Sequence, residues 1–132
     1  MYNKSVIARF QNPKNAGLIK NANGVGEVGN AKCGDIMRIY LKIEDGVIMD
    51  AKFKTFGCVA AIVGADYACD KIKGKKVEDA LKVTNEQILK EMGEVPQNKI
   101  HCSVLAEEVI HEAIKDYYKK LEKEQKKEKK DN

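Results

Sequence analysis

Three cysteines stand in short motifs far apart along the chain: Cys33-Gly34-Asp35, Phe56-Gly57-Cys58 and His101-Cys102-Ser103. Zinc fingers and ribbons instead pair their cysteines in tight Cys-x-x-Cys turns. Here only a folded domain could bring the three thiols together. Because Asp35 and His101 stand close to two of them in sequence, the available ligand set mixes sulfur, oxygen and nitrogen. Such a set is typical of iron–sulfur or zinc sites.

Length and composition indicate one modest domain. The chain has 132 residues, 43% of them hydrophobic, and a net charge of +4. We expect a domain over residues 1–120 and a charged tail over 121–132 that is frayed or disordered. The tail mixes Lys with Glu and does not indicate nucleic-acid binding. Because the chain shows neither a signal-peptide core nor a membrane span, we expect a cytoplasmic protein with reduced thiols.

Alternating apolar and polar residues predict a β-hairpin. The alternation covers residues 37–43, resumes over 47–54, and is interrupted by Glu44-Asp45-Gly46. Asp-Gly between two such runs is a strong hairpin signal. The Gly- and Asn-rich stretch before them predicts mostly loop, with one short strand at 24–29.

Helical spacing of apolar residues predicts the other elements. Helices are expected at residues 2–10, 59–72, 76–81 and 84–91, and from about 103 into the tail. Strands followed by helices indicate an α+β fold. We expect a small three-stranded antiparallel sheet with helices packed on one face and a long C-terminal helix.

These elements would place two thiols at helix starts. Cys33 and Asp35 fall in the loop that enters the first hairpin strand, Cys58 begins the helix after the hairpin, and His101-Cys102 begins the last helix. Unpaired N–H groups at a helix N-terminus favour negative charge and therefore favour the thiolate. The sequence thus predicts an anionic ligand pocket.

The ligand types indicate a labile site. Three thiolates are available, and Asp35 or His101 would take a fourth position. A carboxylate matches iron in a sulfide cluster less well than a thiolate does. Such a site favours building and handing over a cluster rather than permanent electron transfer. Two alternatives remain: a tetrahedral structural zinc site, and, less favoured, a zinc hydrolase or deaminase, for which no Glu accompanies the His-Cys pair.

The motifs also resemble a known family, the iron–sulfur cluster assembly scaffolds of the IscU and NifU N-terminal type. The resemblance runs from Tyr2 to about Tyr118 and includes four motifs: Cys33-Gly34-Asp35-x-Met37, Phe56-Gly57-Cys58, Lys73-Gly74-Lys75 and Lys99-Ile100-His101-Cys102-Ser103-x-Leu105-Ala106-Glu107. It implies a scaffold rather than an enzyme. Such a scaffold takes persulfide sulfur from a cysteine desulfurase and iron from a donor. It then assembles a transient [2Fe–2S] cluster and transfers it to apo iron–sulfur proteins.

The resemblance also implies roles for single residues. Cys33, Cys58 and Cys102 would be cluster ligands, and Cys102 would be the persulfide acceptor. Asp35 would keep the site labile, and His101 would be an alternative ligand, notably in a zinc-bound resting form. The working unit would be a monomer or a cluster-bridged dimer. The alternative function is a zinc-resident protein that accepts sulfane sulfur from the desulfurase and passes it on.

Two features depart from the family pattern. Val95-Pro96-Gln97-Asn98-Lys99 replaces the family's Leu-Pro-Pro-Val-Lys, so we do not expect an Hsp70-type chaperone to bind it as it binds other members. A fourth cysteine, Cys69, falls within the helix predicted at 59–72 and is expected to be core packing. His111 is expected on the surface of the last helix.

Overall fold

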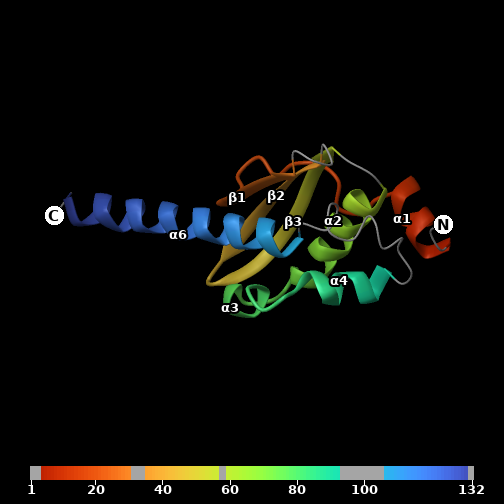
Figure 1. The fold of residues 1–132 in the computed structure, drawn as a ribbon. Coiled ribbons are helices and arrows are strands. Elements are labelled where there is room, and N and C mark those ends of the chain that lie inside the picture. Colours follow the sequence, from red (N-terminus) through yellow and green to blue (C-terminus); the bar gives the residue numbers. More distant parts are fainter. Residues whose placement is uncertain (1–3, 31–34, 57–58, 93–105, 131–132) are drawn as a thin grey trace.

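The structure is a computed structural model that describes residues 4–30, 35–56, 59–92 and 106–130. Its elements follow one another as α1 (Lys4–Gln11), β1 (Gly24–Asn30), β2 (Asp35–Glu44), β3 (Val47–Phe56), α2 (Val59–Ile72), α3 (Val77–Ala80), α4 (Asn85–Met92) and α6 (Ala106–Lys130) (Figure 1). This order confirms the α+β fold expected from the sequence.

The three strands form one antiparallel sheet in the order β1-β2-β3. At the turn between β2 and β3, Asp45 has φ 53° and Gly46 has φ 76°, so both residues are left-handed. Two-residue hairpin turns of this kind favour Asp-Gly because their twist matches that of the strands. The predicted hairpin and its turn are therefore confirmed.

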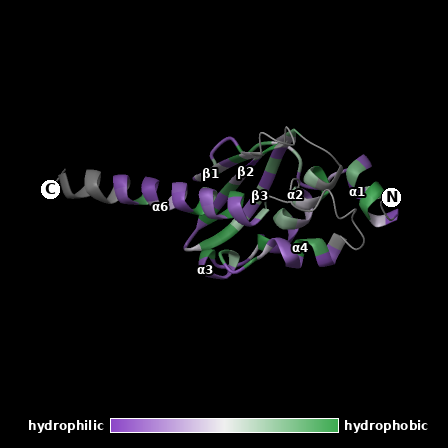
Figure 2. Cartoon of the chain, in the orientation of Figure 1, coloured by the Kyte–Doolittle hydropathy of each residue, from purple (hydrophilic) through white to green (hydrophobic). Residues whose placement is uncertain are grey.

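The described helices cover one face of the sheet. Met37, Ile39 and Leu41 of β2 point toward that face and are almost fully buried. Helix α2 packs on β3 and β2, and α6 packs on β1 and β2. Figure 2 shows the resulting alternation of hydrophobic and hydrophilic residues along the strands. Each fully buried aliphatic side chain of this kind contributes about 1.5–3 kcal/mol to folding.

Helix α6 lies directly against the backbone of β1. A Cβ atom added to Gly26 would lie 2.4 Å from the backbone nitrogen of Ala113 and 2.6 Å from the carbonyl oxygen of Val109. On Gly24 it would lie 2.8 Å from the carbonyl oxygen of Ala113. Glycine is therefore required at both positions by the close approach of the helix. This explains why β1 carries so little of the pattern of a strand.

Helix α6 continues to Lys130, so part of the charged segment 121–132 extends the helix away from the sheet (Figure 1). The division into a domain and a tail at residue 120 stays a prediction. Among the described helices, none has a stretch of the length and hydrophobicity that a membrane crossing needs.

Candidate metal centre

The strands that flank two cysteine motifs end together. Strand β1 ends at Asn30, which pairs with Asp35, the first residue of β2. Ile36 pairs with Phe56, the last residue of β3. The chain therefore enters 31–34 and 57–58 from neighbouring positions at one end of the sheet (Figure 1).

The start of α6 points to the same end. Along β1, Gly24 lies against Ala113 and Tyr117, whereas Gly26 lies against Ala113 and the earlier Val109. Moving toward Asn30 along β1 thus means moving toward the start of α6. The N–H of Glu107 also donates to Oδ1 of Asn85 at 2.8 Å, which joins the start of α6 to the start of α4.

The predicted ligands themselves fall largely outside the described residues. This holds for Cys33, Cys58, His101 and Cys102, whereas Asp35 is placed by its backbone at the start of β2. The ligand set therefore stays a prediction. The structure does show that the flanking elements β1, β2 and β3 end or begin at one end of the sheet.

One helix start agrees with the predicted thiolate environment. Helix α2 begins at Val59, the residue after Cys58, as the sequence predicted. Its first N–H groups lack partners within the helix and favour a nearby negative charge. The described part of α6 begins at Ala106, beyond Cys102, so the matching prediction for Cys102 stays a prediction.

The fourth cysteine lies away from this end and is unsuited to metal binding. Cys69 is fully buried in the hydrophobic core, which confirms the core-packing prediction. Burial raises the pKa of the Cys69 thiol, so it stays protonated. His111 is exposed, as predicted, and its ring lies 3.1 Å from the carbonyl oxygen of Leu81. Within the described ranges, no three His, Cys, Asp or Glu residues gather in a way that could hold a metal ion.

Apolar side chains are exposed beside the candidate centre. Ile36 is 47% exposed and Phe56 is 79% exposed. They contribute to the lining of a cavity of about 710 Å³, together with Pro13, Ala16 and Ile62. Exposed apolar residues around a hollow are typical of an interaction site. The alternation along β2 and β3 predicts that Ile36 and Phe56 lie on the same face of the sheet. It does not predict that their side chains remain exposed there.

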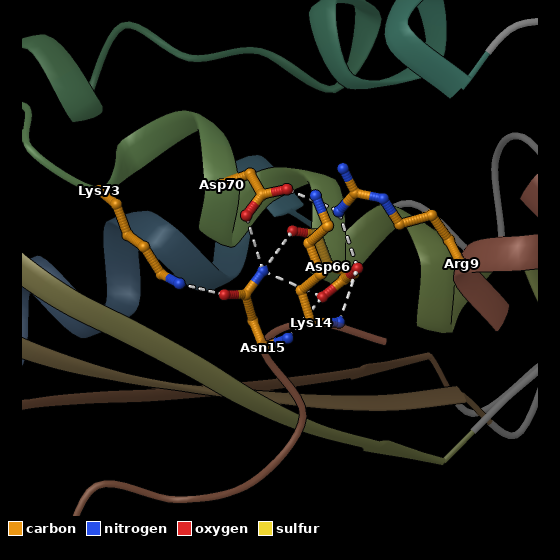
Figure 3. Close-up of polar contacts among 6 residues, drawn as sticks. All are labelled: Arg9, Lys14, Asn15, Asp66, Asp70 and Lys73. Carbon is orange, nitrogen blue, oxygen red and sulfur yellow. Dashed lines mark hydrogen bonds and ion pairs between the residues drawn. The ribbon is translucent and has the colours of Figure 1, made fainter. Parts of the chain in front are cut away.

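A buried carboxylate fastens the N-terminal segment to α2 (Figure 3). Asp66 is fully buried and accepts hydrogen bonds from the guanidinium of Arg9 at 2.8 Å and from the N–H of Asn15 at 2.8 Å. The N–H of Lys14 donates to the same carboxylate at 3.2 Å. Asp70 accepts from Arg9 at 2.6 Å and from the side-chain amide of Asn15 at 3.0 Å. A buried charge is tolerated because it is paired and hydrogen-bonded in this way.

This network also extends the sheet. The N–H of Phe53 donates to the carbonyl of Asn15, and the N–H of Gly17 donates to the carbonyl of Phe53, both at 2.9 Å. Burial would raise the pKa of Asp70, but the hydrogen bonds from Asn15 and Arg9 outweigh it and lower the pKa. The segment before β1 is thus held to β3 and to the helix that follows Cys58. The sequence patterns did not predict this network; the available signal was Asp66 within the apolar run of α2.

Comparisons with known proteins agree with this architecture. The family described as the NifU-like N terminal domain matches residues 1–124. The scaffold protein IscU 1 of Archaeoglobus fulgidus, named for iron–sulfur cluster assembly, is 48% identical over 91% of this chain and 78% of its own length. The IscU scaffold protein of Aquifex aeolicus is 46% identical over 90% of this chain and 77% of its own length. This chain belongs to the NifU-like N-terminal domain family.

A solved structure shares the fold at lower sequence identity. The crystal structure of a NifU-like N-terminal protein from Brucella abortus covers 89% of this chain and 94% of its own, with a TM-score of 0.69 and 20% identity. At this identity the likeness concerns the fold alone. It supports the arrangement of a three-stranded sheet with helices on one face.

Proposed function

We propose that this chain is a scaffold on which a [2Fe–2S] cluster is assembled transiently and then passed to apo-proteins. The observation that carries the proposal is the common position of the elements that flank the three cysteine motifs. Membership of a family whose relatives are named as iron–sulfur cluster assembly scaffolds supports it. The cluster is cargo, so the chain acts as a carrier and not as an enzyme.

In this proposal the thiolates of Cys33, Cys58 and Cys102 hold the cluster, and Asp35 or His101 provides the exchangeable fourth donor. A carboxylate or imidazole holds a sulfide cluster less firmly than a fourth thiolate would. The sulfur comes from a cysteine desulfurase. The Cys102 thiolate attacks the outer sulfur of the donor persulfide, a new S–S bond forms on Cys102, and the donor thiolate leaves. The sulfane sulfur must then gain electrons to become sulfide.

Anaerobic reconstitution tests assembly. The metal-free chain is mixed with ferrous iron, cysteine and a cysteine desulfurase, and dithiothreitol supplies the electrons that iron oxidation does not. We expect the visible absorption and the Mössbauer spectrum of a [2Fe–2S] cluster. Cys33→Ser or Cys58→Ser should abolish the signal, whereas the matched core variant Cys69→Ser should retain it. Assembly that survives loss of either motif cysteine but fails in Cys69→Ser would contradict the proposal.

Sulfur acceptance is tested separately by mass-resolved mapping of persulfides after incubation with the desulfurase alone. We expect the added sulfur on Cys102 and its loss in Cys102→Ser. Sulfur mapped to Cys69 would overturn the assignment. If the chain accepts sulfur, stays colourless with iron and retains about one zinc ion per chain, the zinc-resident sulfur carrier replaces the scaffold.

A further inference from the structure

The face of the sheet turned away from the helices carries positive charge. Arg38 of β2 and Lys52 and Lys54 of β3 alternate with buried residues and therefore project from this face, beside Tyr40. Among the described elements, none packs over it. Lys54 and Arg38 are exposed, and Lys52 is half-buried.

Two of these cations oppose each other directly. In the register of β2 and β3, Arg38 is the cross-strand partner of Lys54. Like charges in opposite positions destabilise a sheet. Arg38 has a partner on its other side, Glu27, at 2.7 Å. Lys52 and Lys54 form no ion pair with any residue in the described ranges. Lys52 and Lys54 are therefore cations that gain no ion pair within the described part of the fold.

The cationic residues lie close to the candidate metal centre. Lys54 is two residues before Phe56, where β3 ends, which corresponds to a rise of about 7 Å along the strand. Lys54 and Arg38 also contribute to the lining of the cavity beside Ile36 and Phe56. A partner bound on this face would therefore stand next to the site from which the cluster leaves.

We propose that this open face docks the carboxylate-rich surface of a protein that accepts the cluster. The inference rests on the proposed function for the identity of the partner. Unpaired cations complement carboxylates, and opposing cations lose their mutual repulsion when carboxylates lie between them. The interaction is mainly electrostatic, so it steers association and weakens as salt increases.

Binding of the metal-free chain to an acidic apo-[2Fe–2S] ferredoxin tests the inference without a cluster. Isothermal titration calorimetry at low and at physiological salt compares wild type with Lys52→Glu/Lys54→Glu. The matched control is Lys82→Glu/Lys115→Glu, which changes the net charge equally at two exposed positions outside the sheet. We expect the sheet variant to bind about tenfold more weakly or worse, and the control to bind within about twofold of wild type.

Folding and assembly controls separate this inference from the proposed function. The sheet variant should melt at or above the wild-type temperature, because Lys54→Glu turns a repulsive pair with Arg38 into an attractive one. It should also assemble the cluster normally. Equal weakening in both double variants, or no weakening in the sheet variant, overturns the inference even if wild type assembles the cluster. Binding to phosphatidylglycerol vesicles through Lys52 and Lys54, without binding to the ferredoxin, overturns it too.

Discussion

The two ends of the sheet are built differently. At the hairpin end, the N–H of Ile48 donates to the carbonyl of Lys75 at 2.9 Å, and the N–H of Val77 donates to the carbonyl of Gly46 at 2.9 Å. The chain after α2 is thus tied back onto the turn. At the opposite end, Ile36 and Phe56 remain 47% and 79% exposed next to the segments that carry the cysteines.

The difference indicates that the contacts that hold the fold together lie apart from the proposed metal centre. Three features stabilise the sheet: the backbone hydrogen bonds at the hairpin end, the packing of helices on one face, and the network around Asp66. The candidate metal centre lies beside the exposed side chains of Ile36 and Phe56. A site that must take up and release its cargo benefits from such an end, because local opening there does not require the core to open. Variants at the packed regions should therefore affect folding, and variants at the open end should not.

The largest effect is expected from Gly26→Ala. Its new Cβ would meet the backbone of α6 at 2.4 Å, and backbone atoms cannot turn aside as a side chain would. We expect a loss of about 3 kcal/mol in the free energy of unfolding, measured by urea denaturation.

Gly46→Ala is the matched control for this variant. No atom lies within 4 Å of an added Cβ there, so only the left-handed backbone at φ 76° resists the change. A loss of about 1 kcal/mol is expected. If both glycine variants lost the same stability, the close contact between β1 and α6 would not be the cause.

Asp66→Asn should have the next largest effect. Among the described residues it leaves Arg9 with Asp70 alone as an ionic partner, and it replaces one buried acceptor oxygen with an amide donor. We expect a loss of about 2 kcal/mol, less than for an entirely buried pair because Arg9 is partly exposed. Asp70→Asn should cost about half as much, because the Asp70 side chain is 34% exposed. Hydrogen exchange should be faster over residues 4–17 in Asp66→Asn but not in Asp70→Asn. This result would show that Asp66 holds the N-terminal segment in place.

A smaller effect is expected for Asp116→Asn in α6. Burial would raise the pKa of Asp116, but hydrogen bonds from Lys120 and from the N–H of Val25 lower it. A carboxyl with a lowered folded-state pKa stabilises the fold above its unfolded pKa of about 4, and this stability is lost as the pH falls through the folded pKa. We expect a loss of about 0.5–1 kcal/mol at neutral pH that vanishes in acid. A difference that persists at low pH would contradict the ionic contribution.

The smallest effect is expected from Phe56→Ser at the open end. Because Phe56 is 79% exposed, the free energy of unfolding should change by no more than ordinary surface substitutions cause, about 0.5 kcal/mol. The loss of unfolding free energy should therefore be much smaller for Phe56→Ser than for Gly26→Ala at the contact between β1 and α6. A large loss of stability in Phe56→Ser would show that the open end contributes to folding after all.

Much of the fold could be predicted from the sequence because local patterns were strong. Alternation on both sides of Asp45-Gly46 determined the hairpin, and the apolar run after Cys58 determined α2. The pairing of Ala16 with Phe53 was missed, because a segment without alternation reads as loop. The close contact at Gly26 could not be predicted either, since it depends on where a helix distant in sequence crosses the strand.

For the candidate site, the sequence predicts residue types but not geometry, and the ligand set stays a prediction. Three separated motifs identify the cysteines without any knowledge of structure. The sequence does not show that β1, β2, β3 and α6 all have one terminus at the same end, because this follows from strand register and helix packing. The open cationic face was equally hidden: only the register places Arg38 opposite Lys54.

Cluster transfer tests the central claim most directly. Wild type and Asp35→Ala are loaded anaerobically, freed of excess iron and mixed with an apo-ferredoxin, and circular dichroism in the visible range follows where the cluster resides. We expect the wild-type cluster to move to the ferredoxin, and the Asp35→Ala cluster to move more slowly because the weaker donor is gone. A wild-type cluster that stays on the chain, or an Asp35→Ala cluster that leaves as fast, would contradict the account.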